Sequence, residues 1–166
     1  MKNLKDAILI FEKAANTLFE KMQEGRDNLK DIGKERNVVH LKDITANNEF
    51  TEDSLLATQI IPGVMLLSFV NELAIKQIYY QDRQGQITGH SLSKLFSQLK
   101  QSRKENIISR VKSELNIDSD EFNSSLGSNS SGFIDWRYFY ENTDKNFSDN
   151  QFLSSLLKSL KKEILW

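Results

Sequence analysis

The fold class follows from one apolar stretch near the middle of the chain, SLLATQIIPGVMLLSFVNELAIKQIYYQ (residues 54–81). Read as a helix, this stretch is apolar on nearly every side, which is typical of a helix buried all round. Residues 51–54, Thr-Glu-Asp-Ser, place N-capping side chains and acids in front of it. Pro62, the only proline in the chain, cannot donate a backbone hydrogen bond. We therefore expect a central buried helix that is kinked or restarted at Pro62, so that residues 54–61 could form a separate short helix.

Amphipathic helices are predicted on both sides of this central helix. Residues 2–24, and the chain from residue 149 onward, carry apolar side chains at three- and four-residue spacing. The same spacing predicts shorter helices over residues 90–100 and 103–115. No useful length of alternating apolar and polar residues, and no repeat, is present. The sequence thus predicts an all-α protein, an irregular up-and-down bundle of about five or six helices.

Two segments between these helices have a different composition. Residues 26–50 mix charges with a short apolar run, and we expect a connector with room for one helical turn. Residues 116–132 are rich in Ser, Asn, Asp and Gly, with Phe122 and Leu126 as apolar anchors, which predicts a mobile surface loop. At 166 residues and 39% hydrophobic, the chain fits a single domain, residues 1–166.

The composition also excludes several classes of function. The chain has no Cys and only two His, His40 and His90, far apart in sequence, so we expect no disulfide, no metal centre and no cofactor. Its apolar runs fall short of the roughly 18 residues that a membrane span needs, and no secretory signal is visible. We expect a cytoplasmic protein that does not bind membranes. Because the net charge is −1, any nucleic-acid binding must be local.

Three short motifs combine polar residues with apolar surroundings. They are Glu72-Leu73-Ala74-Ile75-Lys76, Gly89-His90-Ser91-Leu92-Ser93-Lys94-Leu95-Phe96, and Phe133-Ile134-Asp135-Trp136-Arg137-Tyr138-Phe139-Tyr140-Glu141. Together they resemble the HEPN superfamily of helical domains, over residues 54 to 141. The resemblance implies an up-and-down helical core that commonly forms a homodimer. It also implies a role in a prokaryotic defence or toxin-type system, where many members of the family are metal-independent ribonucleases.

The resemblance is incomplete at the residues that would catalyse RNA cleavage. Catalytic members have an Arg followed within about two helical turns by a His; Arg137 matches the Arg, but residues 138–144 contain no His. A general acid or base must titrate near neutral pH, as His does. His90 could take this role if its turn lies beside Arg137, with Arg137 binding a phosphate and Glu141 orienting the imidazole. Alternatively, His90 packs at its helix start, and Arg137 pairs with Glu141 or Glu72.

The remaining polar and aromatic residues of the motifs each have two interpretations. Glu72 and Lys76, four residues apart, form either an ordinary surface pair or part of a buried polar network with Arg137 or His90. The aromatic residues after position 132 belong to the core, or they stack bases or line a dimer seam. These aromatic residues are Phe133, Trp136, Tyr138, Phe139 and Tyr140.

A basic stretch runs from His90 to Lys112, with six Lys or Arg residues and one acidic residue. It is the best candidate for a surface that faces phosphates. From it we select as nucleic-acid-binding residues Lys94, Lys100, Arg103 and Lys104. Because acidic residues follow at once, the charged exterior of an ordinary helix is the alternative.

The sequence thus predicts a HEPN-like homodimer that has lost the usual catalytic His and acts as a non-catalytic RNA-, nucleotide- or protein-binding module. An active metal-independent ribonuclease that uses His90 and Arg137 is one alternative. A purely structural or regulatory dimerisation domain is the other. Salt dependence of nucleic-acid binding separates the last from the first two, because phosphate binding weakens as salt rises.

Overall fold

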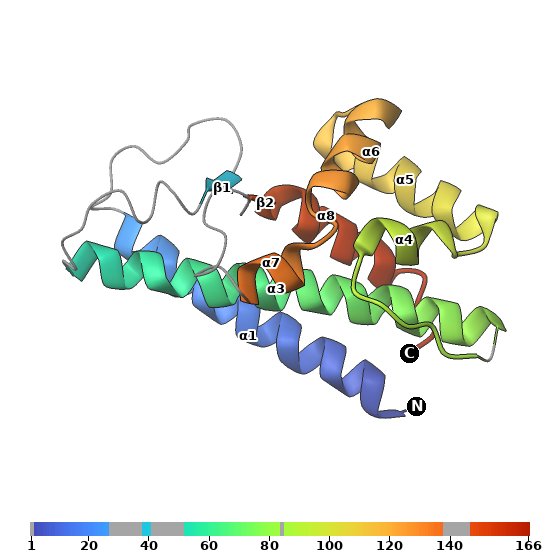
Figure 1. Ribbon diagram of the computed structural model, residues 1–166, viewed down its shortest axis with the longest axis horizontal. Helices are drawn as coiled ribbons and strands as arrows, with labels where there is room; N and C mark the ends of the chain where they lie inside the picture. Colours follow the sequence, from blue (N-terminus) through green and yellow to red (C-terminus); the bar gives the residue numbers. More distant parts are fainter. Residues whose placement is uncertain (1, 27–37, 41–51, 84, 138–146) are drawn as a thin grey trace.

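The computed structural model describes residues 2–26, 38–40, 52–83, 85–137 and 147–166, and these form an all-α fold (Figure 1). In chain order the elements are α1 (Lys2–Arg26), β1 (Val38–His40), α3 (Glu52–Arg83), α4 (Leu92–Ser97), α5 (Gln101–Leu115), α6 (Ser119–Ser128), α7 (Gly132–Arg137), β2 (Phe147–Asp149) and α8 (Asn150–Lys161). The two strands have three residues each and pair antiparallel, with Val39 opposite Ser148. None of the described helices is long and apolar enough to cross a bilayer.

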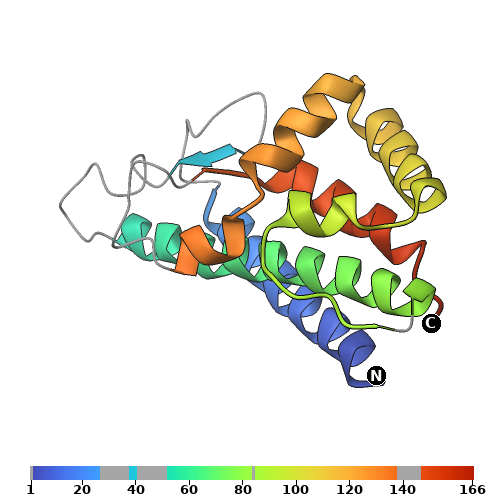
Figure 2. The ribbon, with the colours of Figure 1, turned by 45° about the vertical axis from the view of Figure 1, so that its right-hand side comes forward.

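Helix α3 is the centre of the molecule. Helix α1 runs antiparallel along one side of it, α8 and α4 pack on α3 away from α1, and α5 lies on the far side of α8 (Figures 1 and 2). The buried side chains of α3 include Val70, Leu73 and Ile75, which lie on different sides of the helix. Apolar residues on all sides are needed because α3 is covered by several helices. The helices predicted over residues 2–24, 54–81, 90–100, 103–115 and from 149 onward are confirmed.

The prediction that Pro62 divides the central helix is wrong. Helix α3 continues through Pro62 as a single helix of 32 residues. A proline inside a helix removes one backbone hydrogen bond, and packing against neighbouring helices can compensate for that loss. Such packing is present, because a Cβ atom on Gly63 would lie 3.1 Å from Cε1 of Phe19 in α1. The two helices therefore approach closely at the residue after the proline.

The prediction of a loop over residues 116–132 is also wrong. Most of this segment is α6, which starts with a capping box: Asp118 Oδ1 accepts hydrogen bonds from the backbone N–H groups of Asp120 and Glu121, and the Glu121 carboxylate accepts from Asp118 N–H. Phe122 and Leu126, one turn apart, are buried on the inner face. A good cap and two apolar anchors outweigh the polar composition.

Of the predicted connector over residues 26–50, the structure describes residue 26 and residues 38–40. Arg26 is the last residue of α1, and residues 38–40 form β1, where no element was predicted. The helical turn expected in this connector lies outside the described residues.

The short helix α7 docks on α3 at a point where no side chain fits. A Cβ atom on Gly132 would lie 2.7 Å from Ser68 Oγ, and this hydroxyl is buried without a hydrogen-bond partner in the described structure. We expect Gly132→Ala to lower the free energy of unfolding by about 1 kcal/mol, at the lower end for overpacking, because the Ser68 hydroxyl must turn away from the new methyl group. We expect Ser68→Ala alone to be nearly neutral, since the lost hydroxyl is unpaired.

The double variant Ser68→Ala with Gly132→Ala provides the control. Without Oγ, the nearest atom to the new methyl group is Ser68 Cβ at 3.4 Å, so most of the lost stability should return. Urea unfolding followed by circular dichroism measures all three variants. Equal losses in the single Gly132 variant and the double variant would contradict the close approach of α3 and α7.

Candidate functional site

The candidate site is built around a buried carboxylate on α3. The side chain of Glu72 is only 1% exposed, and its Oε1 accepts a hydrogen bond from Lys76 Nζ at 2.7 Å. His90 Nδ1 lies 3.0 Å from Oε2 and 3.1 Å from Oε1 of the same carboxylate. We call these three residues the Glu72 clamp. Of the two interpretations of Glu72 and Lys76, the structure shows the buried polar network with His90.

Local structure explains how His90 reaches α3. Lys76 follows Glu72 by one helical turn, a spacing that brings the two side chains together. His90 comes from the turn before α4, where Gly89 has φ +102°, a conformation that favours glycine. Ser91 then caps α4, its Oγ accepting from Lys94 N–H. The turn at Gly89 and the cap at Ser91 thus fix the residue between them against Glu72.

An aromatic stack covers one side of the clamp. The rings of His90 and Phe133 lie with centroids 5.7 Å apart, and Phe133 stacks on Phe69 of α3 at 4.6 Å. Phe69 in turn meets the edge of Phe11 from α1 at 5.1 Å. Phe133 is half-buried, so this member of the predicted aromatic set belongs to the packing between α3 and α7.

The geometry of the clamp determines which ring nitrogen of His90 carries the proton in the neutral imidazole. A carboxylate only accepts hydrogen bonds, so the contact with Glu72 assigns the proton to Nδ1. Nε2 is then the free nitrogen of a side chain that is 49% exposed. When the imidazole is neutral, Nε2 can accept a proton or a hydrogen bond from a ligand, and when the ring is protonated it can donate one. Glu72 is thus a positioning residue for His90.

Two of the three residues selected as catalytic cannot be placed at this site. Arg137 is the last residue of α7, one helical turn after Phe133, but its side chain lies outside the described residues. Glu141 also lies outside them, as do the side chains of the aromatic residues after Phe133. The roles of Arg137 and Glu141 therefore remain predictions, and the structure places His90 alone of the three.

A cluster of three hydroxyl groups next to the clamp was not predicted. Ser130 Oγ lies 2.7 Å from both Ser91 Oγ and Ser93 Oγ and accepts a hydrogen bond from Ser93 N–H. Leu92 N–H also donates to the Ser130 carbonyl at 2.9 Å. These bonds join the start of α4 to the junction of α6 and α7. Sequence offers no signal for them, since Ser130 comes nearly forty residues after Ser91 in a chain rich in serine.

The selected basic residues differ in how much charge they leave free. Lys100 Nζ lies 3.5 Å from Asp82 at the end of α3, and Arg103 binds both Asp82 and Glu163. Lys94 is exposed and Lys104 half-buried, and neither forms an ion pair among the described residues. Of the four selected residues, Lys94 and Lys104 therefore carry positive charge that no acid among the described residues neutralises.

Glu163 pairs with two of the basic residues of α5. Its carboxylate is buried and receives hydrogen bonds from Arg103 and Arg110, which lie two turns apart on α5. Burial alone would raise the pKa of Glu163, but the hydrogen bonds and charges of the two arginines outweigh it and hold this pKa below its ordinary value of 4.5. Hydrogen bonds to Glu163, then to Asp82, raise the pKa of Arg103. These arginines therefore stabilise the packing of α5 against the end of the chain.

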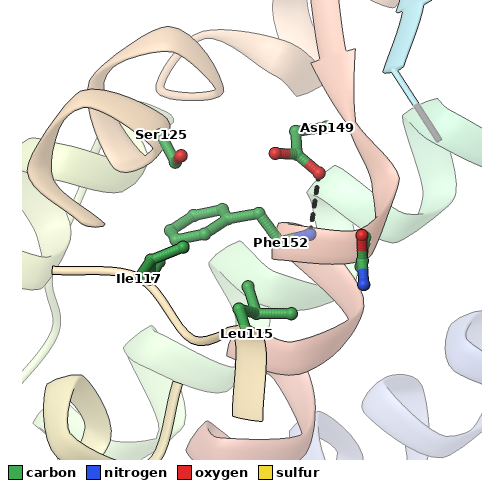
Figure 3. A pocket seen from close by; sticks show the side chains of 6 residues that line it. Leu115, Ile117, Ser125, Asp149 and Phe152 are labelled. Carbon is green, nitrogen blue, oxygen red and sulfur yellow. Dashed lines mark hydrogen bonds between the residues drawn. The ribbon is translucent and has the colours of Figure 1, made fainter. Parts of the chain in front are cut away.

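A small hollow lies between the end of α5, α6 and the start of α8 (Figure 3). It contains about 250 Å³ of empty space and is lined by Leu115, Ile117, Ser125, Asp149, Gln151 and Phe152. Asp149 already accepts the N–H of Phe152 at 2.9 Å as the N-cap of α8, shown as the dashed line in Figure 3. Much of this space is open solvent, and the enclosed part of about 20 Å³ has room for about one water molecule, far less than the roughly 300 Å³ at which ligand sites start.

No protein-family model, curated protein or solved structure matches this chain. The likeness to the HEPN superfamily accordingly rests on the three sequence motifs. Over the part of the chain that the structure describes, no three His, Asp or Glu side chains gather as ligands of a metal ion would.

Proposed function

We propose that the chain is a HEPN-like helical domain that binds single-stranded RNA, without cleaving it, at the surface around His90. The observation that carries this proposal is the Glu72 clamp, which holds a half-exposed imidazole in one orientation on a buried carboxylate. A fixed imidazole offers a phosphate or a base a hydrogen-bonding group without first losing side-chain freedom. Membership of the superfamily, and a place in a defence or toxin system, are part of the proposal.

Two lysines, one of α4 and one of α5, support a ligand with phosphates. Lys94 comes four residues after His90 and is exposed. Lys104 lies near the end of α4, with its Nζ 3.5 Å from the Ser97 carbonyl oxygen. These free ammonium groups provide the positive charge that a nucleic-acid backbone attracts. Because the surface has few such groups, we expect modest affinity with a shallow dependence on salt.

RNA binding is tested by fluorescence anisotropy with a labelled single-stranded RNA at 50 and 200 mM salt. We expect binding that weakens with salt, and we expect His90→Ala and Lys94→Ala each to reduce affinity by about 3- to 10-fold. The matched control is Lys158→Ala, which removes an exposed lysine that pairs with Glu114. Absence of binding at 50 mM salt, or equal losses in the Lys94 and Lys158 variants, would contradict the proposal.

An active ribonuclease is the second candidate, and the position of Nε2 favours it. A carboxylate on Nδ1 with Nε2 directed away from it is the arrangement in which His acts as a general base. RNA cleavage also needs a general acid, however, and the clamp contains a single imidazole. For this reason we place binding first.

The two candidates are separated by incubating the same RNA with the protein and a chelator of metal ions. We expect the RNA to remain intact. If it is cleaved instead, a ribonuclease should lose about 10²- to 10⁴-fold in rate in His90→Ala, and also slow in Glu72→Gln, which keeps the shape of the positioning residue but not its charge. Cleavage unchanged in both folded variants would point to a contaminating enzyme.

A further inference from the structure

The outward face of α1 carries an apolar pair between two opposite charges. Leu9 and Ile10 are 46% and 64% exposed, and they are two of the five large hydrophobic side chains that the described residues expose. Asp6 precedes the pair and Lys13 follows it, and both are exposed on the same stripe of the helix. The opposite face of α1 is buried against the core, so the helix presents this stripe in a fixed position.

This stripe is complementary to itself in one arrangement. The four positions are symmetric about the point between residues 9 and 10. If two α1 helices pack antiparallel around a two-fold axis at that point, Asp6 of each copy faces Lys13 of the other, and Leu9 faces Ile10. Parallel packing would instead place Asp6 against Asp6 and Lys13 against Lys13. We propose that this face of α1 binds the same face of a second copy of the chain, antiparallel.

Further apolar surface lies beside the stripe. Lys161 Nζ binds the Glu12 carboxylate of α1, and the indole N–H of Trp166 donates to the Lys161 carbonyl at 3.3 Å. Trp166 and Leu165 are 56% and 69% exposed. Figures 1 and 2 both show the last residues next to the first turns of α1. Trp166 and Leu165 thus add exposed apolar surface near the start of α1.

The size of the surface determines the kind of dimer. One pair of helices with two further apolar side chains covers less than the standard interface of about 1,200–2,000 Å². We therefore expect a weak dimer, which dissociates at low protein concentration and forms as the concentration rises. The inference does not depend on RNA binding, because none of these residues belongs to the Glu72 clamp or to the basic surface of α4 and α5.

Sedimentation equilibrium of the full chain over a range of concentrations tests the proposal. Wild type should show a reversible monomer–dimer equilibrium, which Ile10→Lys should abolish. Asp6→Lys alone, or Lys13→Asp alone, should weaken the dimer by at least about tenfold, because each places like charges opposite one another twice. The double variant Asp6→Lys with Lys13→Asp recreates both ion pairs and should restore the dimer.

Each outcome of this experiment bears on the antiparallel contact. A wild type that stays monomeric, a dimer that survives Ile10→Lys, or a double variant that is no better than the single ones would overturn it. Glu20→Lys, an exposed residue of α1 outside the symmetric pair, is the control and should leave the dimer unchanged. Thermal unfolding by circular dichroism shows that each variant is folded, as expected for exposed positions.

Discussion

Replacing Phe122 by Ala should lower the free energy of unfolding by about 3–5 kcal/mol. The Phe122 side chain is fully buried, and its ring lies 5.8 Å from that of Phe96 and 5.5 Å from that of Phe152. The variant would leave a cavity where α4, α6 and α8 meet. Since small domains are stable by only about 5–15 kcal/mol, a loss of this size is easily measured by urea or guanidinium unfolding.

The control for this experiment is the next residue. Asn123 is exposed on the outer face of α6, and Asn123→Ala should change stability by less than about 0.5 kcal/mol. Both variants introduce alanine at neighbouring positions of one helix, so the difference between them reports packing. A loss below about 1 kcal/mol for Phe122→Ala would contradict the burial of this ring between α4 and α8.

The second large effect is expected at Glu163. Removing this carboxylate leaves Arg103 and Arg110 without their shared partner, so Glu163→Ala should cost about 3 kcal/mol, at the lower end for buried ion pairs. Both arginines keep some contact with water, and Arg103 keeps Asp82, which limits the loss. The matched control is Glu114→Ala, which breaks the exposed pair with Lys158 and should cost less than about 1 kcal/mol. Equal losses in the two variants would contradict the structure.

The pH dependence of Glu163 gives the same experiment a second readout. Because the folded-state pKa of Glu163 lies below its ordinary value of 4.5, ionised Glu163 stabilises the fold above about pH 4.5, and this contribution is lost as the pH falls through the folded-state pKa. The stability difference between wild type and Glu163→Gln should therefore be constant near neutral pH and shrink below pH 4.5. Other acids titrate in both proteins, so the comparison isolates this one. A difference independent of pH would show that its charge has no part in stability.

The helices that could be predicted are those whose core contacts repeat along the helix. The stripe of α1, the uniformly apolar α3 and the stripe of α8 specify both helix and burial from sequence alone. Helix α6 could not be recognised in this way, because its stability comes from the Asp118 cap and from two apolar anchors in a polar segment. The restart predicted at Pro62 was wrong for a related reason. The packing of Gly63 on α1 is a tertiary contact, which the local sequence does not show.

The candidate site shows the same division between local and remote contacts. The contact of Lys76 with Glu72 follows from their spacing, and the sequence allowed but did not decide between a surface pair and a buried network with His90. The buried network depends on the turn at Gly89, which brings His90 to Glu72, a residue far from it in the sequence. The partners of the basic helix could not be predicted, because Asp82 and Glu163 come from other elements. The charge surplus that the sequence shows is therefore larger than the free charge of the folded surface.

The contact between the rings of His90 and Phe133 makes the clamp visible to nuclear magnetic resonance. An aromatic ring shifts the resonances of protons close to it, and the chain has only two histidines, so the imidazole protons of His90 give a simple spectrum. Their chemical shifts followed against pH report the protonation of His90 directly. The same signals followed during addition of RNA report whether a ligand reaches Nε2. The ring pair is thus an internal probe that needs no label.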